Sequence, residues 1–251
     1  MDDKFFEQIK KASEDSIKNP GKNDKPLPKE ESSIDPEIYV FRHGETHDNL
    51  NKVFSGWRDS NLTDKGIKQA EVLAEKLKGK NIQICITSPQ VRAKETARIA
   101  LKYHKDMVFE LDQRIMERNY GDLTGQSKEK WMQENPEMAV KYRRGYDFPP
   151  PNGESLKMVE ERVFPFCDEL VERVRRNNVN IAISCHGNSM RAIRRYFEKL
   201  SIIEELTLEN PLGQDYAAYV VRNRSVQEAE KKLSWNYLKK LFISNKKLFK
   251  N

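Results

Sequence analysis

The 251-residue chain lacks several features that would assign it to other protein classes. Its three cysteines, Cys85, Cys167 and Cys185, are widely spaced and form no CxxC pair, which is typical of thiols buried in a reducing compartment. No segment approaches the run of about 20 apolar residues that a membrane helix requires. The first residues also lack a basic start followed by an apolar stretch. We therefore expect no secretory signal and a cytoplasmic location.

Positive charge is concentrated at one end of the chain. The formal net charge of +6 and the pI of about 9.0 would suit a nucleic-acid partner. Residues 225–251, however, hold seven lysines against two glutamates, whereas residues 1–35 hold seven lysines against nine acidic residues. The stretch between them has an ordinary charge balance. We therefore expect no nucleic-acid or membrane partner, although contact of the basic tail with an anionic membrane surface stays open.

Composition divides the chain into three parts. Residues 1–35 are rich in Lys, Glu, Asp, Ser and Pro, and they cannot bury enough apolar surface to offset the entropy of ordering. They predict a flexible charged arm with one helical turn between Phe5 and Ile9. Residues 36–224 contain the apolar runs of a folded domain. Residues 225–251 predict a basic amphipathic tail that packs on this domain.

Short apolar runs alternate with helical patterns in the central part. The runs at 38–41, 82–86, 181–184 and 216–221 have the length and composition of buried strands. Thr63, Ser155 and Ser201 stand where N-caps would begin helices, and Pro165 predicts a kink in the second of these helices. The alternation predicts an α/β fold, a three-layer sandwich with a mainly parallel central sheet covered by helices on both faces. In such sheets ligands bind beyond the carboxyl ends of the strands.

Two His-Gly pairs follow predicted strands. The run 38–41 leads into Arg42-His43-Gly44-Glu45-Thr46, and the run 181–184 leads into Cys185-His186-Gly187-Asn188-Ser189. A neutral imidazole is a competent nucleophile toward phosphorus, and an arginine binds phosphoryl oxygens through two parallel hydrogen bonds. The pattern therefore indicates phosphoryl transfer. Five specified residues recur by chance about once in three million positions, so the first string is far more specific than an isolated Arg-His-Gly.

The first string resembles the signature of the histidine phosphatase superfamily, and later blocks resemble its cofactor-dependent phosphoglycerate mutase branch. The resemblance extends from about residue 38 to about residue 221. Its blocks are Phe54-Ser55-Gly56-Trp57-Arg58-Asp59, Thr87-Ser88-Pro89 with Arg92, Glu117-Arg118-Asn119-Tyr120-Gly121, Arg143-Arg144 before Pro149-Pro150-Pro151, and His186-Gly187-Asn188-Ser189.

The resemblance implies a role for each of these residues. His43 would be the nucleophile that becomes phosphohistidine. Glu117 would move the proton of the substrate hydroxyl, a role that a carboxyl can fill if partial burial raises its pKa toward neutrality. The moving phosphoryl group would be bound by Arg42, Arg92 and His186. The implied substrate-binding residues are Asn49, Ser55, Gly56, Arg118, Tyr120, Lys128, Arg143, Arg144, Gly187 and Asn188.

The implied activity is the interconversion of 3- and 2-phosphoglycerate in glycolysis and gluconeogenesis, primed by 2,3-bisphosphoglycerate. Phosphoglycerates would be the small-molecule partners, and a homodimer stays open.

We expect no metal, because Gly44 stands where the zinc motif HExxH has its glutamate. Only two residues separate Pro149-Pro150-Pro151 from Glu154-Ser155-Leu156, whereas longer family members have a longer link. Short links also occur in phosphatases of the superfamily, so a broad-specificity histidine-type phosphomonoesterase is the alternative. A catalytically silent phosphate-binding protein is a third hypothesis, which the presence of His43 and Glu117 disfavours.

Overall fold

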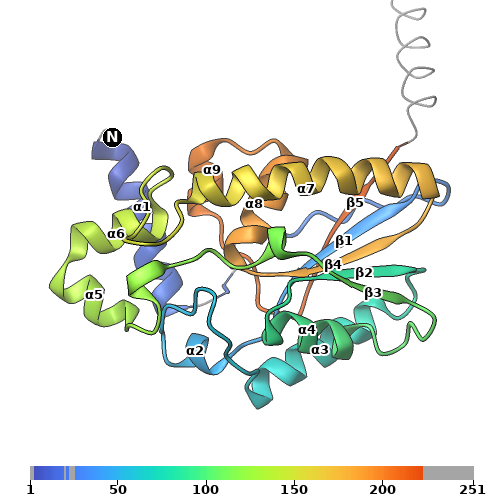
Figure 1. The fold of residues 1–251 in the computed structure, drawn as a ribbon, viewed down its shortest axis with the longest axis horizontal. Coiled ribbons are helices and arrows are strands. Elements are labelled where there is room, and N and C mark those ends of the chain that lie inside the picture. Colours follow the sequence, from blue (N-terminus) through green and yellow to red (C-terminus); the bar gives the residue numbers. More distant parts are fainter. Residues whose placement is uncertain (1–2, 20, 23–25, 223–251) are drawn as a thin grey trace, which may run out of the picture.

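The computed structural model describes residues 3–222 except residues 20 and 23–25. The strands are β1 (Glu37–Arg42), β2 (Ile84–Thr87), β3 (Val108–Leu111), β4 (Ile181–Cys185) and β5 (Ala217–Val220). The α-helices are α1 (Asp3–Lys18), α2 (His47–Leu50), α3 (Asp64–Leu77), α4 (Val91–Ala100), α5 (Lys128–Glu134), α6 (Pro136–Arg144), α7 (Leu156–Asn177), α8 (Gly187–Glu198) and α9 (Ile202–Thr207). Figure 1 shows their arrangement around a single sheet.

The sheet is mainly parallel, as the sequence predicts. Its strand order is β3-β2-β4-β1-β5. The pairs β3–β2, β2–β4 and β4–β1 are parallel, whereas β5 runs antiparallel to β1. The four predicted apolar runs all contribute strands, with bounds that differ from the prediction by one or two residues at most ends. Strand β3 was not predicted.

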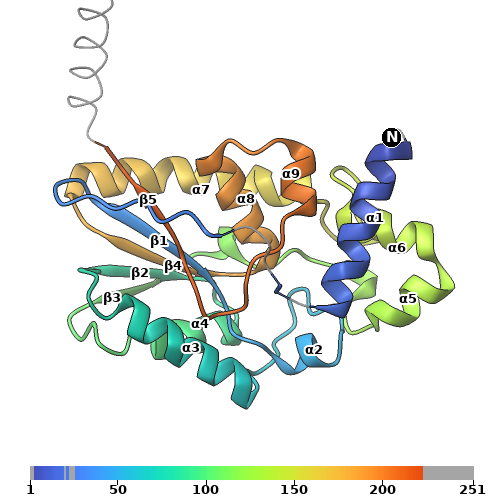
Figure 2. The same cartoon turned by 180° about the vertical axis from the view of Figure 1, so that it is seen from behind.

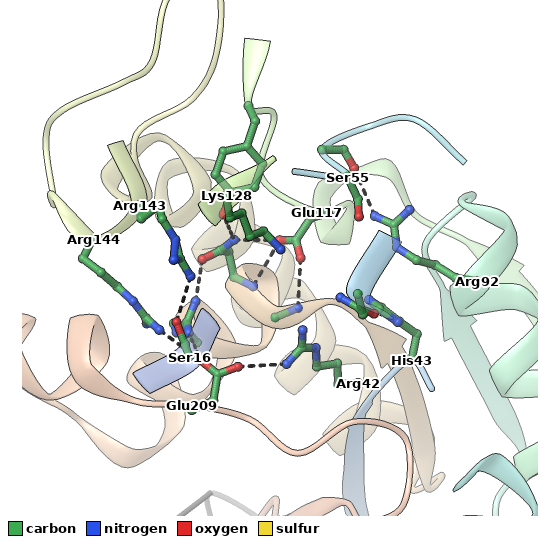
Figure 3. A pocket seen from close by; sticks show the side chains of 16 residues that line it. Ser16, Arg42, His43, Ser55, Arg92, Glu117, Lys128, Arg143, Arg144 and Glu209 are labelled. Atoms are coloured by element: carbon green, nitrogen blue, oxygen red, sulfur yellow. Dashed lines mark hydrogen bonds and ion pairs between the residues drawn. The ribbon is translucent and has the colours of Figure 1, made fainter. Parts of the chain in front are cut away.

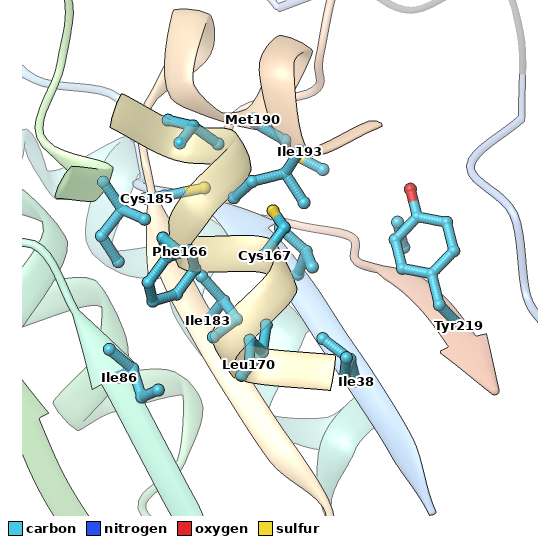
Figure 4. Close-up of a cluster of buried hydrophobic side chains, with 14 of the residues drawn as sticks. Ile38, Ile86, Phe166, Cys167, Leu170, Ile183, Cys185, Met190, Ile193 and Tyr219 are labelled. Atoms are coloured by element: carbon cyan, nitrogen blue, oxygen red, sulfur yellow. The ribbon is translucent and has the colours of Figure 1, made fainter. Parts of the chain in front are cut away.

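Helices cover both faces of the sheet, which confirms the three-layer sandwich (Figures 1 and 2). On one face α7 and α8 pack against alternate side chains of β1 and β4, among them Ile38 and Ile183 (Figure 4). On the other face α3 and α4 pack against the intervening side chains, among them Tyr39 and Ala182. Neighbouring residues of a strand point to opposite faces, so each central strand contributes to both hydrophobic clusters.

Side-chain caps begin the helices where the sequence predicts them. Thr63 accepts a hydrogen bond from the N–H of Gly66, and Ser155 accepts one from the N–H of Met158. Ser201 and Glu204 form a reciprocal capping box at the start of α9. Helix α7 continues through Pro165, so the proline does not end the helix.

The N-terminal segment differs from the expected flexible arm. Residues 3–18 form helix α1, in which Ile9, Ser13 and Ile17 are buried at a spacing of four residues. Ile9 packs in a small apolar cluster with Val140 and Leu206, which come from α6 and α9. The charged composition concealed this amphipathic pattern, because most of the charged side chains lie on the opposite, exposed face of the helix.

The predicted basic tail, 225–251, lies outside the described residues, and the boundaries of the central domain stay a prediction. Among the described residues, no helix has the length and apolar character needed to cross a membrane.

Candidate active site

Two histidines face each other beyond the carboxyl ends of β1 and β4. The two strands are parallel neighbours, with Arg42 opposite Cys185, so the residues that follow them emerge side by side. The ring centroids of His43 and His186 are 5.1 Å apart, and both side chains are almost completely buried. The structure thus brings together the two His-Gly pairs that the strand pattern places at one edge of the sheet.

Hydrogen bonds give the two rings opposite tautomers. Nδ1 of His43 lies 2.7 Å from the carbonyl oxygen of Gly44, which can only accept a proton, so the lone pair is on Nε2. Nδ1 of His186 accepts from Nε of Arg92 at 3.1 Å, so its proton is on Nε2. This Nε2–H is buried and has no partner among the described residues. The site therefore offers one nucleophilic nitrogen and one unsatisfied donor.

The protein environment keeps both rings neutral. Burial, and then the charges of Arg92 and Arg42, hold the pKa of His43 well below its ordinary value of 6.5. Burial and the charge of Arg92 act in the same direction on the pKa of His186. At neutral pH the lone pair of His43 is consequently available for attack on phosphorus, as the sequence analysis requires.

Two buried arginines flank the histidines. Arg92 is 1% exposed and donates to the carbonyl oxygens of Gly56 and Arg58, in addition to His186. Arg42 uses Nη1 to donate to Glu209 at 3.0 Å and to the carbonyl of Asn210 at 2.9 Å, whereas its buried Nε–H has no partner among the described residues. A phosphoryl group bound here would satisfy this donor.

The glycine of the first string serves close packing. A Cβ atom added to Gly44 would lie 2.4 Å from the carbonyl oxygen of Gly66, so no larger residue fits between β1 and the start of α3. This contact fixes the backbone that carries His43. The glycine therefore positions the nucleophile through its lack of a side chain.

Glu117 lies at the N-terminus of α8, opposite the histidines. Its carboxylate accepts hydrogen bonds from the backbone N–H groups of Arg118, Gly187 and Asn188 and from the side-chain amide of Asn188. Burial raises the pKa of Glu117, but the charge of Arg92 and these hydrogen bonds outweigh it and leave the pKa below its ordinary value. The expected rise toward neutrality is therefore wrong for the site without a ligand.

These side chains surround a narrow cavity of about 70 Å³. Figure 3 shows His43, Arg92 and Ser55 toward one side of it and Arg143, Arg144 and Ser16 toward the other. Of the residues predicted for the site, those lining the cavity are Arg42, His43, Asn49, Ser55, Gly56, Arg92, Glu117, Tyr120, Lys128, Arg143, Arg144, Gly187 and Asn188. His186 is not among the lining residues, but its ring faces that of His43 and accepts a hydrogen bond from Arg92.

Arg118 does not line the cavity, contrary to the role that the resemblance implies. Its completely buried guanidinium donates to the carbonyl oxygens of Glu154 and Arg143. It therefore supports the loop that carries the cavity wall. Its backbone N–H, which orients Glu117, gives it a second supporting contact.

Cations dominate the end of the cavity away from the histidines. Burial, followed by the charges of Arg143 and Arg42, lowers the pKa of Lys128 to about 7, although part of its side chain reaches solvent. Burial also lowers the pKa of Arg143 to about 10 and that of Arg144 to about 9. An anion that binds here raises these pKa values, so it restores the proton of Lys128 and is favoured by the charge of all three cations.

Three residues on the cavity wall were absent from the predicted site: Ser16, Arg191 and Glu209. Glu209 forms ion pairs with Arg42, Arg144 and Arg191, and although burial raises its pKa, the charges of Arg191 and Arg144 lower it to about 2. Arg191 lies in the second turn of α8, which His186 caps. Glu209 and Ser16 lie outside every recognised motif, so only the fold could reveal them.

The same centre contains a group that could bind a metal ion. Among the described residues, ligand atoms of His43, Glu117 and His186 all lie within 4.8 Å of one another. However, the charges of Arg42 and Arg92 act on all three groups and lower their pKa values. Such a field attracts a phosphoryl anion more strongly than a divalent cation. Metal independence stays a prediction.

Comparisons with known proteins agree with this geometry. A profile of the histidine phosphatase superfamily (branch 1) matches residues 38–222. The chain is 37% identical to a 2,3-bisphosphoglycerate-dependent phosphoglycerate mutase of Parvibaculum lavamentivorans, over 70% of this chain and 86% of that protein. It is 38% identical to a protein of the same name from a Methylobacterium species, over 70% of this chain and 84% of that protein.

Solved structures share the fold. A mycobacterial glucosyl-3-phosphoglycerate phosphatase is 22% identical, with a TM-score of 0.65 over 75% of this chain and 99% of that chain. A Bacillus stearothermophilus protein, YhfR, is 25% identical, with a TM-score of 0.66 over 73% of this chain and 90% of that chain. The chain is thus similar in sequence to proteins named as mutases and in fold to a protein named as a phosphatase.

Proposed function

Because the chain belongs to the histidine phosphatase superfamily, we propose that it is a 2,3-bisphosphoglycerate-dependent phosphoglycerate mutase that transfers a phosphoryl group through His43. The observation that carries the proposal is the second cluster of cations, Lys128, Arg143 and Arg144, across the cavity from the histidines. A phosphatase acting on a simple monoester needs charge only at the reacting phosphate. A phosphoglycerate carries a carboxylate and, as the bisphosphate, a second phosphate that require this further cluster.

The residues fit an anionic primer. The buried donors that have no partner among the described residues include Nε of Arg42 and Nε2 of His186, and phosphoryl oxygens would satisfy both. When bound, 2,3-bisphosphoglycerate supplies the phosphoryl group that loads His43. The arginines and lysine at the other end would bind the remaining anionic groups and hold the carbon skeleton in register.

The proposed transfer uses the lone pair on Nε2 of His43. As an N–P bond forms there, the P–O ester bond breaks and the departing oxygen takes a proton from Glu117. In the return step the substrate hydroxyl gives its proton to Glu117 and attacks phosphorus, and the N–P bond breaks. Arg42, Arg92 and His186 would stabilise the charge on the equatorial oxygens in both directions.

The proton transfer depends on what occupies the cavity. Arg92 and hydrogen bonds hold the pKa of Glu117 down in the free enzyme, against the effect of burial. A phosphoryl dianion offsets the charge of Arg92, so the effect of burial then prevails and the pKa of Glu117 rises. Binding of the phosphoryl group would thereby prepare the carboxyl for its role as acid and base.

A phosphomonoesterase is the second candidate, and two observations favour it. The cavity of about 70 Å³ is small, and Arg143 and Arg144 donate to groups of the protein itself. In that case water would take the phosphoryl group from His43.

The three buried, free cysteines suit a reducing compartment for either enzyme. We propose a cytoplasmic location and a glycolytic or gluconeogenic role for the mutase.

One assay separates the two candidates. Conversion of 3-phosphoglycerate is measured with and without added 2,3-bisphosphoglycerate, and released inorganic phosphate is measured in parallel. We expect conversion to require the primer and to exceed phosphate release. Phosphate release without isomerisation would replace the mutase with the phosphatase.

A further inference from the structure

Helix α1 lies outside the segment that matches the superfamily, yet it contacts the cavity. The match begins at residue 38, whereas α1 covers residues 3–18. Its last turn brings Ser16 to the cavity wall, next to Arg143 and Arg144 (Figure 3). A segment additional to the family profile therefore borders the end of the cavity to which we assign the second anionic group.

Contacts from α1 fix the conformations of both arginines. Arg143 donates to the side-chain oxygen of Ser16 at 2.8 Å and to the carbonyl oxygen of Ser13 at 3.1 Å. Arg144 donates to the carbonyl oxygen of Ala12 at 3.4 Å. Ser16 lies in the last turn of α1, where a helix carries partial negative charge, so this end of the helix stabilises the guanidinium of Arg143 placed against it.

The helix is held in place by packing remote from the cavity. Ile9 is completely buried in a cluster with Val140, Leu156 and Leu206. These three residues come from α6, the start of α7 and α9. The packing of Ile9 therefore holds Ser16, two helical turns further along α1, against the arginines.

We propose that α1 is a substrate-specificity element, in which Ser16 positions Arg143 to bind the non-reacting anionic group of the substrate. Ser16 acts through Arg143 and is thus a positioning residue. The inference rests on the proposed function, because it requires a substrate with a second anionic group. It predicts that disturbing α1 weakens binding of a bisphosphorylated ligand and spares binding at the reacting end.

Calorimetric titration tests this directly. The full-length chain with His43→Ala, which cannot take up a phosphoryl group, is titrated with 2,3-bisphosphoglycerate and, separately, with inorganic phosphate. Ser16→Ala removes one hydrogen bond to Arg143, so we expect about a three- to tenfold loss of affinity for the bisphosphate. Ile9→Asp buries a carboxylate and undocks α1, so we expect a loss of at least about tenfold. Affinity for inorganic phosphate should change less than about twofold in both variants.

Two controls keep the outcome interpretable. Lys4→Asp introduces the same carboxylate on the exposed side of α1 and should bind both ligands as the parent does. Ser16→Thr retains the hydroxyl and should restore most of the affinity for the bisphosphate. Should Ile9→Asp fail to fold by near-ultraviolet circular dichroism, Ser16→Ala and Ser16→Thr carry the test alone.

The possible failures are distinguishable. If the parent binds the bisphosphate no more tightly than inorganic phosphate, the proposed function fails. If the parent prefers the bisphosphate and Ser16→Ala leaves that preference unchanged, the role of α1 is refuted while the mutase proposal stands. Equal losses for both ligands, or tighter binding after α1 is undocked, would also refute it, because the helix would then be a general support or a closed lid.

Discussion

Substrate binding should weaken between pH 7.0 and 8.0 because Lys128 loses its proton there. The pKa of this lysine in the free site is about 7, against 10.5 for an ordinary lysine, chiefly because of burial and secondly because of Arg143 and Arg42. A bound anion restores the proton, so the pKa rises on binding. A group whose pKa rises on binding favours binding below the pKa of the free state and loses that effect as the pH increases through it.

The size of the effect follows from the protonated fraction. With a pKa of about 7, roughly half of the free enzyme carries the proton at pH 7.0 and about a tenth does at pH 8.0. KM for 3-phosphoglycerate should therefore increase about fivefold over this interval. Phosphate esters have a second pKa of about 6, so the substrate stays almost fully ionised. Arg144, with a pKa of about 9, also keeps most of its charge.

Lys128→Arg supplies the matched control, because a guanidinium keeps its charge across this range. Its KM should vary less than about twofold between pH 7.0 and 8.0, whereas Lys128→Met should give a high KM at both values. Initial rates are measured at saturating primer in one buffer series of constant ionic strength. A wild-type KM that does not change with pH, or an equal change in Lys128→Arg, would refute the assignment of the pH dependence to this ammonium group.

Three further predictions follow from the site. His43→Ala should lose several orders of magnitude in activity together with its acid-labile, base-stable phosphoenzyme, and a phosphoenzyme that survives the substitution would refute its role as nucleophile. EDTA should leave the rate unchanged and vanadate should inhibit, whereas activity lost on chelation and restored by a divalent metal would contradict metal independence. Arg143→Ala should reduce isomerisation about ten- to a hundredfold more than hydrolysis of a small phosphomonoester, while Arg92→Ala should reduce both; an unaltered ratio in Arg143→Ala would favour the phosphatase.

Buried strands and capped helices were predictable from the sequence. The central strand β4 and its neighbour β1 appear as short apolar runs because both of their faces are buried. Thr63 and Ser155 mark helix starts because their side chains cap nearby backbone N–H groups, which depends only on local chain geometry. Strand β3 escaped prediction because its side chains are mostly exposed. An edge strand with little burial leaves no apolar run to recognise.

The site also contains residues that a local motif predicts and residues that only the fold brings to the cavity. His43 and His186 lie immediately after β1 and β4, so a local motif specifies both their identity and their place. Ser16, in the last turn of α1, and Glu209, two residues after α9, line the cavity, and neither belongs to a local pattern. Helix α1 shows why composition misleads: three residues spaced by four, Ile9, Ser13 and Ile17, bury one face while the charges remain in solvent.

The charge state of Glu117 could not be predicted from its burial alone. Burial is the largest single influence on its pKa and acts upward, but the charges of Arg92 and Arg42 and the hydrogen bonds from Arg118 and Asn188 together act more strongly downward. The hydrogen bonds remain when a ligand binds, whereas the effect of Arg92 depends on whether a phosphoryl dianion offsets its charge. The acid–base behaviour of Glu117 is therefore coupled to occupancy of the neighbouring phosphate site. Replacing Arg92 with a neutral residue should consequently alter the pH profile of kcat as well as binding. Without the charge of Arg92, a bound phosphoryl dianion no longer offsets a charge that holds the pKa of Glu117 down.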